Sequence, residues 1–520
     1  MPEVRRRPTF LEWIALGVGL VLLWRYRWIL DDAFVYFRYI DNFLFLDLGL
    51  VYNRGEYVEG YSSPLWLLLL LGFRALRLDY WYVLLGVGVV AFLAFWWCLV
   101  ELRRRTAPHG PELPVPALFL CGNYGVLCYF TSGMETPLVQ LAAALFALFV
   151  FRPSSPGLQA ALGLAPLLRH ELFLPVALGA AWAWKRNRFP WTLVLVCLST
   201  LGGWVLFRIY YYADFFPNTF YLKNTWEVRR GFVYLHETLS TYHLYELGAL
   251  AVLGAWWTSR RGLGGRGAER LVLLAAAVVV AAYVVKIGGD ARHYRYLAFP
   301  FVLAVCATSG IWEALFASLG LGRRSALVAG PAILLLGASF YPPQLDRHPI
   351  TGKEKAGLVR GISDAAFHRH HPSLRHASWS RDVSPEKLLA AKASGTELHR
   401  AVLVDGWCAR IYRRYTFRVV QRFGLTDPFL SRARVRANRA GHKLSLLPLA
   451  KDLAAIEQSL GWVGRGMFRA ALAELPAYRR PQWVERNLAV LERIERRAYN
   501  RHDFLENLRL ALRPVRGFRP

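Results

Sequence analysis

The chain alternates long apolar runs with short polar or basic segments up to about residue 341, and beyond that point it becomes mainly polar. A helix needs about 20 mostly apolar residues to cross the hydrocarbon core of a bilayer. This pattern predicts an all-α polytopic membrane protein with about 9–11 transmembrane helices. The candidate spans lie roughly at residues 10–30, 81–101, 115–131, 134–151, 158–168, 171–184, 191–212, 244–258, 271–287, 297–318 and 325–341.

The run Pro64–Leu78 decides the topology, because its apolar core, Leu65–Leu71, is short. That core extends only about 10 Å as a helix, against roughly 30 Å of hydrocarbon. If the run lies along the interface or dips in and returns, every strongly basic loop falls on the cytoplasmic side, as the positive-inside rule requires. Residues 31–79 then form one large outer loop with interfacial helices. The basic loops are Arg103–Arg105, Lys185–Arg188, Arg260–Arg270 and Arg323–Arg324.

Asp31 and Asp32 stand directly after the first apolar run, whose N-terminal flank carries Arg5–Arg7. The arginines keep that end in the cytoplasm, so the acid pair is expected at the outer surface. The first run is too long for a cleaved signal peptide and is expected to remain as an anchor. A carboxylate at the membrane boundary suits a base that serves a membrane-dissolved substrate. A helix cap or a stop-transfer acid pair explains the same position equally well.

The same topology places three other segments and the tail on the outer face with Asp31: Gly133–Glu135, Tyr211–Leu222 and Gly288–Arg295. The last of these continues to Pro300 and combines glycines with cations. Glycines allow a close backbone approach, and guanidinium groups grip phosphate in a bidentate manner. Arginines that flank a helix also snorkel to the interface without binding anything. Cations on the outer side depart from the usual bias, which favours a phosphate site formed by Arg292, His293 and Arg295.

Other outer segments contain further candidate ligands. Aromatic side chains dominate Tyr210–Thr225 and Glu56–Trp66, where an interfacial anchor is the simpler explanation and sugar binding is the alternative. Lys223, in the first of these segments, is a candidate phosphate ligand. Glu135 either caps a helix N-terminus or supplies a second acid near the reaction centre. The candidate sugar or acceptor ligands are Glu56, Glu59, Tyr61, Glu135, Asn218, Tyr221 and Asp290.

The net charge of +28 reflects the basic cytoplasmic loops together with an Arg-rich tail. If the tail lies outside, its charge favours contact with anionic lipid head groups or with a phosphorylated acceptor. Nucleic acid is not an expected partner, because no nucleic-acid-binding motif occurs and the chain is mostly lipid-embedded. No C-x-x-C spacing occurs, and no disulfide is expected. The irregular spacing of His368, His370, His371 and His376 argues against a metal site.

The chain divides by composition into a membrane-embedded part, 1–341, and a tail, 342–520, which is expected outside the cytoplasm. Within the tail, Ala401–Asp405 and Phe417–Gln421 are predicted to be strands. Lys451–Leu475 and Pro481–Leu512 have helical spacing and many charge pairs four residues apart. The tail is therefore predicted to be a small α/β or mostly helical domain.

Several of these segments together resemble bacterial GT-C glycosyltransferases, and most closely the arabinofuranosyltransferase B type. DDAFVYFRYIDNFL followed by GLVYNRGEYVEGYSSPLW is similar to the first outer loop of that family. GMETPL, PNTFYLK and GGDARHYRYLAFP occur in the family's order, and VDGWCARIYRRYTFRVVQRFGLTDP resembles its outer-domain strand pair. Where many relatives carry Arg-Pro-Glu-Gly, this chain has Arg169-His170-Glu171-Leu172.

The resemblance implies a decaprenyl- or undecaprenyl-phosphate sugar donor, catalysis outside the cytoplasm and inversion at the anomeric carbon. The family's base maps to Asp31, with Asp32 beside it to orient the acceptor or a divalent cation. The phosphate-binding cations map to Lys223, Arg292 and Arg295.

The expected function is therefore that of a multi-pass glycosyltransferase in the bacterial inner membrane, with its active site facing outward. It moves a sugar, with arabinofuranose as the candidate, from a polyprenyl phosphate to an envelope glycan, lipid or protein acceptor. The alternative is a transporter or flippase of lipid-linked sugars without transfer activity. A transporter needs polar residues along a path through the membrane. The spans are largely apolar and the polar groups cluster at one face, which favours the enzyme.

Overall fold

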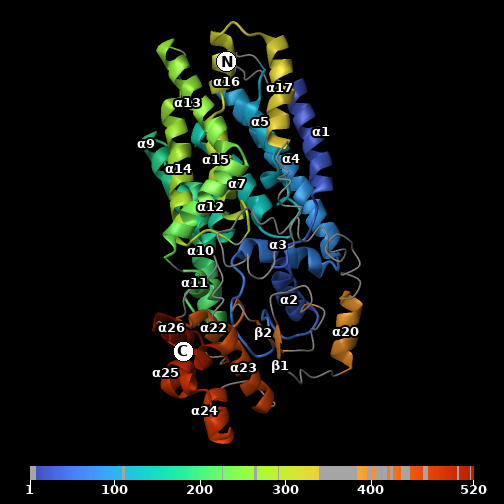
Figure 1. Cartoon of the computed structure of the whole chain (residues 1–520), viewed down its shortest axis with the longest axis vertical. Helices are drawn as coiled ribbons and strands as arrows, with labels where there is room; N and C mark the ends of the chain where they lie inside the picture. Colours follow the sequence, from blue (N-terminus) through green and yellow to red (C-terminus); the bar gives the residue numbers. More distant parts are fainter. Residues whose placement is uncertain are drawn as a thin grey trace. The chain divides into compact units, whose positions relative to one another are not determined.

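Figure 1 shows the chain as a computed structural model in which most regular structure is helical. The chain divides into two compact units, each built from three separate segments. Unit 1 comprises Met1–Ile29, Leu84–Thr200 and Glu227–Arg375, and unit 2 comprises Leu30–Val83, Leu201–Trp226 and His376–Pro520. The structure describes residues 7–107, 112–224, 226–262, 266–290, 292–338, 383–394, 401–404, 412, 418–421, 425–434, 446–460, 466–499, 503–513, 515 and 517–519.

In its described part, unit 1 is built from helices. The 3-10 turns η1, η2 and η3 stand between or directly before helices. The helix α10 begins in unit 1 and ends in unit 2, and α4 begins in unit 2. The elements are α1 (Phe10–Arg25), α4 (Tyr80–Thr106), α5 (Val115–Gly122), α6 (Tyr124–Leu127), α7 (Thr136–Phe151), α8 (Pro156–Gly163), η1 (Ala165–Leu167), η2 (His170–Leu172), α9 (Phe173–Lys185), α10 (Trp191–Tyr212), α12 (Val228–Thr241), α13 (Leu244–Arg260), α14 (Gly267–Lys286), η3 (Arg295–Leu297), α15 (Ala298–Ala307), α16 (Ile311–Ser318) and α17 (Arg323–Ala338).

Four helical stretches among the described residues are long and apolar enough to cross a membrane: α4, α10, α14 and Arg295–Ser318. All four coincide with predicted spans. The prediction of a mostly helical chain with apolar spans is therefore confirmed, and membrane crossing by the other predicted spans stays a prediction. The short apolar run Pro64–Leu78, which decides the predicted topology, forms the helix α3 (Pro64–Ala75). With 12 residues, α3 is about 18 Å long and too short to cross the hydrocarbon core of a bilayer alone.

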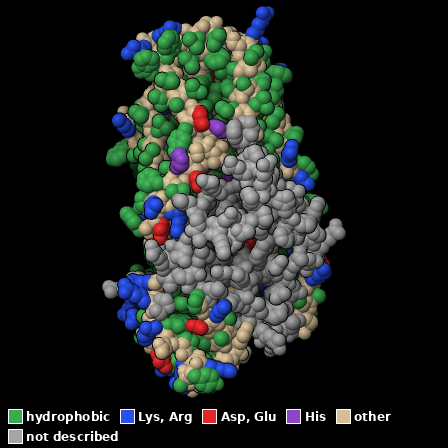
Figure 2. Space-filling view, in the orientation of Figure 1, with side chains coloured by type: hydrophobic (Ala, Val, Ile, Leu, Met, Phe, Trp, Pro, Cys, Tyr) green, Lys and Arg blue, Asp and Glu red, His purple; other side chains and the backbone are tan. Residues whose placement is uncertain are grey.

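Exposed hydrophobic side chains follow the helices of unit 1, as Figure 2 shows along α13, α14 and α17. Leu253, Val278 and Val328 are 61%, 65% and 78% exposed. Exposure of apolar surface of this extent to water is unfavourable, whereas contact of the same surface with lipid chains is favourable. The exposed face of these helices therefore has the character of a lipid-facing surface.

Several helices of unit 1 pack at backbone distance because glycine leaves room at the contact. An added methyl group on Gly231 of α12 would lie 2.0 Å from the carbonyl oxygen of Val285 in α14. One on Gly88 of α4 would lie 2.3 Å from the carbonyl oxygen of Phe130. Small residues at helix crossings are typical of membrane bundles, where close van der Waals contact drives association.

Unit 2 combines helices with a two-stranded parallel sheet. The two predicted strands form at Ala401–Val404 (β1) and Arg418–Gln421 (β2), and Val402 pairs with Val419. Residue 341, where the predicted domain boundary falls, lies outside the described residues, and that division stays a prediction. The remaining elements are α2 (Ala33–Leu44), α3, α11 (Asn218–Lys223), α20 (Pro385–Ala393), α22 (Pro428–Arg432), α23 (Leu447–Leu460), α24 (Met467–Glu474), η7 (Ala477–Arg479), α25 (Gln482–Ala498) and α26 (Phe504–Leu512).

The core of the tail in unit 2 is an apolar cluster contributed by α22 to α25 and the strand β2. Phe429 packs edge-on against Phe468, with ring centroids 4.7 Å apart, and Trp483 stacks on Phe518 at 5.7 Å. Leu222 of α11 belongs to the same cluster. Burial of these aromatic side chains supplies much of the local stability, and it joins α11 to the tail.

Replacing Gly231 by alanine should destabilise the protein by about 1–3 kcal/mol, because α12 and α14 must separate to admit the methyl group. Thermal unfolding in detergent measures this as a lower Tm. Gly248→Ala in α13 is the matched control, since nothing lies within 4 Å of the added methyl group. It should leave the Tm unchanged or raise it slightly through better helix propensity. Equal Tm values for the two variants would contradict the proposed close packing.

Candidate active site

Asp31 and Asp32 begin the first turn of α2 in unit 2. The backbone N–H groups of Phe34 and Val35 donate to their carbonyl oxygens, at 3.2 and 3.1 Å. Asp32 is the N-cap residue, but no capping hydrogen bond from its side chain is formed within the described part of the chain. Capping therefore does not account for this carboxylate. The positive end of the helix dipole favours ionised acids here, and a general base must be ionised.

Asp41, two turns farther along α2, fixes this helix to its neighbours. Its buried carboxylate accepts hydrogen bonds from Arg74 Nε of α3 at 2.9 Å, from the Tyr80 hydroxyl at 3.1 Å and from the hydroxyl of Tyr412. Burial raises the pKa of Asp41, although the adjacent Arg74 acts in the opposite direction. Because both α3 and Tyr412, which is 371 residues after Asp41, bind this one carboxylate, the helix that directly follows Asp31 and Asp32 is held firmly.

Glu59, a candidate sugar ligand, is committed to an internal ion pair. Its carboxylate is paired with Arg208 of α10 and accepts a hydrogen bond from Trp204 Nε1 at 3.1 Å. Its backbone carbonyl accepts the N–H of Asn218 at 2.8 Å. Arg208 also donates to the carbonyl of Phe215 at 3.1 Å. These contacts give Glu59 a role in positioning the loop that contains it.

Asn218, another candidate ligand, holds the segment that contains the GLTDP motif. Its amide nitrogen donates to the carbonyl oxygens of Leu425 and Asp427, at 2.9 and 3.1 Å. Its amide oxygen accepts from Ser431 Oγ at 2.6 Å and from Arg432 Nη1 at 3.2 Å. Asp427 in turn caps α22 through two backbone N–H bonds of 2.8 Å. The side chain thus joins two motifs that are more than 200 residues apart.

Residues 53–61 are tied to the tail in a similar way. The side chain of Asn53 pairs with the backbone of Val419 in β2, accepting at 3.0 Å and donating at 3.1 Å. It also donates to the carboxylate of Glu56 at 2.8 Å. Tyr61 is buried, and its hydroxyl lies 2.9 Å from that of Tyr212. Glu56 and Tyr61 are therefore parts of the packed interior of unit 2.

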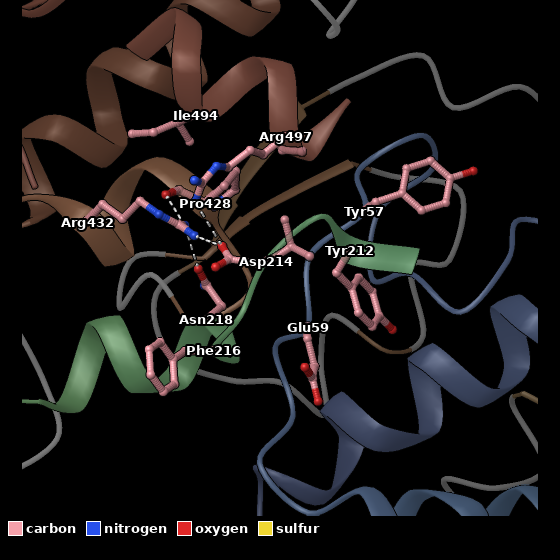
Figure 3. A pocket seen from close by; sticks show the side chains of 12 residues that line it. Tyr57, Glu59, Tyr212, Asp214, Phe216, Asn218, Pro428, Arg432, Ile494 and Arg497 are labelled. Carbon is pink, nitrogen blue, oxygen red and sulfur yellow. Dashed lines mark hydrogen bonds and ion pairs between the residues drawn. The ribbon is translucent and has the colours of Figure 1, made fainter. Parts of the chain in front are cut away.

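A small cavity of unit 2 lies where these segments meet, as Figure 3 shows. Asp214 stands at its centre, paired with Arg432 and 3.7 Å from Nη1 of Arg497. The hydroxyl of Tyr221 donates to the other oxygen of Asp214 at 2.6 Å. The space open to the centre of a water molecule is about 20 Å³, which is enough to hold a water. Tyr221, the last candidate ligand in this unit, therefore supports the Asp214 ion-pair cluster.

In unit 1, the predicted phosphate segment forms a buried cluster of charges. Nη2 of Arg295 lies 3.5 Å from Glu135, and its Nη1 lies 3.7 Å from Asp290. Arg169 donates to the carbonyl of Arg295 at 3.3 Å and forms an ion pair with Glu171. GMETPL and GGDARHYRY, which the sequence placed on one face, therefore meet in space. Buried guanidinium groups of this kind are suited to an anionic ligand.

The backbone that carries these cations has an unusual conformation. Gly288 and Gly289 have φ values of +87° and +73°, and Tyr294 has a φ of +61°, which is rare for a residue with a side chain. His293 is buried, its ring is hydrogen-bonded to the Tyr242 hydroxyl, and its carbonyl accepts from Tyr129 at 2.9 Å. These contacts hold the segment in a strained form, and such strain is common at ligand sites. Arg292, which is also buried, lies between Asp290 and this strained turn in the sequence.

Asp31, Asp32 and Lys223, which ends α11, belong to unit 2, whereas Arg292, His293 and Arg295 belong to unit 1. Their meeting in one catalytic cavity therefore stays a prediction. Across the described ranges, no three His, Cys, Asp or Glu side chains gather as a metal site would require, and the role of Asp32 toward a divalent cation also stays a prediction. The cluster from His368 to His376 lies outside the described residues.

The residues that partner the candidates were not predicted from the sequence. Asp214, Arg432 and Arg497 come from segments 218 and 65 residues apart, and no motif joins them. Arg208 offered a usable signal, because an ionisable residue inside an apolar span needs a partner. Arg169 offered a second signal of an ion pair, because it stands two residues before Glu171 in a short polar segment between two apolar runs.

Comparison with known proteins gives two relatives of the same kind. The chain is 25% identical over 365 residues to a terminal beta-(1->2)-arabinofuranosyltransferase of Corynebacterium glutamicum, covering 58% of this chain and 51% of the relative. It is 28% identical over 348 residues to a terminal beta-(1->2)-arabinofuranosyltransferase of Mycobacterium tuberculosis, covering 55% and 54%. The chain thus matches about half the length of these curated relatives. No family model and no solved structure matches it. The similarity indicates a distant relationship to arabinofuranosyltransferases.

Asn218→Ala should loosen α22, because two backbone carbonyls, Ser431 and Arg432 lose their partner. A buried group left unsatisfied costs about 1–3 kcal/mol. Hydrogen exchange of the amides of Phe429 and Leu430 should then become roughly 5–150-fold faster. The amides of α24 serve as an internal reference and should not change. Unaltered exchange in α22 would show that Asn218 does not hold this segment.

Proposed function

We propose that this protein is an inverting glycosyltransferase of the cell envelope. It moves a sugar, with arabinofuranose as the candidate, from a polyprenyl phosphate to a glycan, lipid or protein acceptor at the outer face of the inner membrane. The names of the two relatives support transfer of this sugar in general terms. The donor lipid is inferred from the resemblance of the motifs.

The observation that carries the proposal is the buried charge cluster of unit 1. Arg169, Arg292 and Arg295 are buried there, together with Glu135 and Asp290. Acidic side chains hold two of these arginines in place: Glu171 pairs with Arg169, and Glu135 and Asp290 flank Arg295. Guanidinium groups fixed in this way suit a phosphate, which they can bind through two parallel hydrogen bonds. The polyprenyl phosphate released in the reaction is such a ligand, and its negative charge grows as the bond to the sugar breaks.

In the proposed reaction, the carboxylate of Asp31 accepts the proton of the acceptor hydroxyl. The hydroxyl oxygen attacks the anomeric carbon from the side opposite the phosphate, which inverts the configuration. The bond between that carbon and the phosphate oxygen breaks, and its electron pair leaves with the polyprenyl phosphate. Arg292 and Arg295, assisted by Lys223, stabilise the leaving phosphate. Asp32 orients the acceptor.

A transporter of lipid-linked sugars is the competing function. It would use polar groups inside the apolar spans. Arg208 in α10 is such a group, but its ion pair with Glu59 gives it a structural role. Transfer of labelled sugar to acceptor, as opposed to movement of the donor across proteoliposome membranes, separates the two functions.

Asp31→Asn should lower kcat by about 10²–10⁴-fold, because the amide cannot take a proton. The assay follows transfer from a polyprenyl-phosphate arabinofuranose donor by the purified protein in membranes. Asp47→Asn, at an exposed acid in the same loop, is the matched control and should keep full activity. Undiminished transfer by the Asp31 variant would overturn its assignment as the base.

Arg292→Gln should raise the KM for the donor by about 10–100-fold, the range expected for loss of a charged hydrogen bond. Arg292→Lys keeps the charge but loses the planar fork, and should have an intermediate KM. Arg323→Gln, at an arginine whose side chain is 73% exposed, is the control. Equal KM values for all three variants, each with a normal Tm, would exclude a phosphate contact at Arg292.

A further inference from the structure

The last helix of the chain, α26, is amphipathic. Asn507 and Ala511 are buried on one face, whereas Leu505 and Leu512 are each 63% exposed on the other. Phe504 is 37% exposed. Three large apolar side chains are therefore exposed along nine residues. This face is suited to an apolar partner, because its burial would remove apolar surface from water.

The buried face of α26 is attached to the end of a candidate membrane span. The amide nitrogen of Asn507 donates to the carbonyl oxygen of Tyr210 at 2.6 Å. Tyr210 is in the last turn of α10, one of the four helices long and apolar enough to cross a membrane. A helix attached there lies at the depth where such a span leaves the hydrocarbon core. This contact is within unit 2.

Exposed aromatic side chains lie at the end of α10 and in the segment that follows it. Tyr210 is 57% exposed, and Phe216 and Phe220 stack with their ring centroids 4.3 Å apart while remaining 41% and 37% exposed. Aromatic belts of this kind occur where helices leave the bilayer. Trp226, which follows α11, is 77% exposed. The end of α10, to which α26 is attached, and the segment after it thus have the composition of a membrane interface.

Basic side chains complete the pattern. The side chain of Arg509, which lies on the exposed side of α26, is 73% exposed. Figure 2 shows Lys and Arg side chains gathered over α25 and α26. Arg497 donates to the carbonyl oxygens of Leu510 and Arg513, which fixes the C-terminal end of the helix. An amphipathic helix with an arginine beside its apolar face and further basic side chains nearby is typical of contact with anionic lipid.

We propose that α26 is an interfacial helix that rests on the membrane, with Leu505 and Leu512 among the acyl chains and Arg509 at the head groups. A second copy of the chain is a less suitable partner. A helix of nine residues is about 13 Å long and offers far less than the roughly 800 Å² per partner of a stable interface. An interfacial helix can rest on lipid without burying an interface of that area. The proposal does not depend on the catalytic function.

Site-directed spin labelling of the full chain in nanodiscs of phosphatidylglycerol and phosphatidylcholine tests this proposal. The nitroxide is attached to Leu505→Cys or Leu512→Cys in a Cys408→Ser background, since the other five cysteines are buried. Collision rates with oxygen, which concentrates in lipid, are compared with those of a water-soluble nickel complex. Tyr478→Cys is the control, because Tyr478 is 81% exposed in the same part of the chain but outside α26.

Labels at 505 and 512 should collide more with oxygen than with the nickel complex, and the label at 478 should show the reverse. Nickel accessibility at 505 and 512 equal to that at 478 would overturn the proposal. Low accessibility to both reagents, with dipolar broadening between labels, would instead assign the face to a second copy and also overturn it. Because the readout is the environment of α26, it remains valid even if the chain transfers no sugar.

Discussion

The side-chain amide of Asn218 is the contact on which the arrangement of unit 2 depends. All its hydrogen-bonding groups are used within the protein: they hold the Leu425–Asp427 backbone, Ser431 and Arg432. Unit 2 is made of three segments that are distant in sequence, and each must be joined to the others by specific contacts. Hydrogen bonds of this kind select one packing of the segments. Any shift between the segments would leave buried carbonyl groups without hydrogen-bond donors.

The same principle explains why the candidate sugar ligands of unit 2 are engaged internally. Glu59 is paired with Arg208, Tyr61 lies against Tyr212, and Tyr221 donates to Asp214. A sugar site and a polar core use the same acids, amides and tyrosines. These residues shape the scaffold behind Asp31, and direct contact with a substrate by any of them stays a prediction.

The sequence predicted the elements well and their partners poorly. The spans α4, α10 and α14 follow from the length of their apolar runs, and the strands β1 and β2 follow from short apolar patterns, both of which are local properties. The meeting of Glu135 with Arg295 could be anticipated, because counting spans placed both segments on one face. The cluster of Asp214, Arg432 and Arg497 could not, since it depends on how α11, α22 and α25 pack. Tertiary packing leaves no periodic signal in a single sequence.

The bond between Asn53 and Val419 spans 366 residues, and this has a consequence for biosynthesis. At about 5–20 residues per second, the ribosome needs roughly 20–70 s to make the chain between them. During that interval the loop that contains Asn53 lacks the strand to which this asparagine binds. Its carboxylates and tyrosines then remain hydrated, which keeps the waiting loop soluble until the tail arrives. Polar residues are costly to bury in a packed interior, but they are well suited to a segment that is synthesised early and buried late.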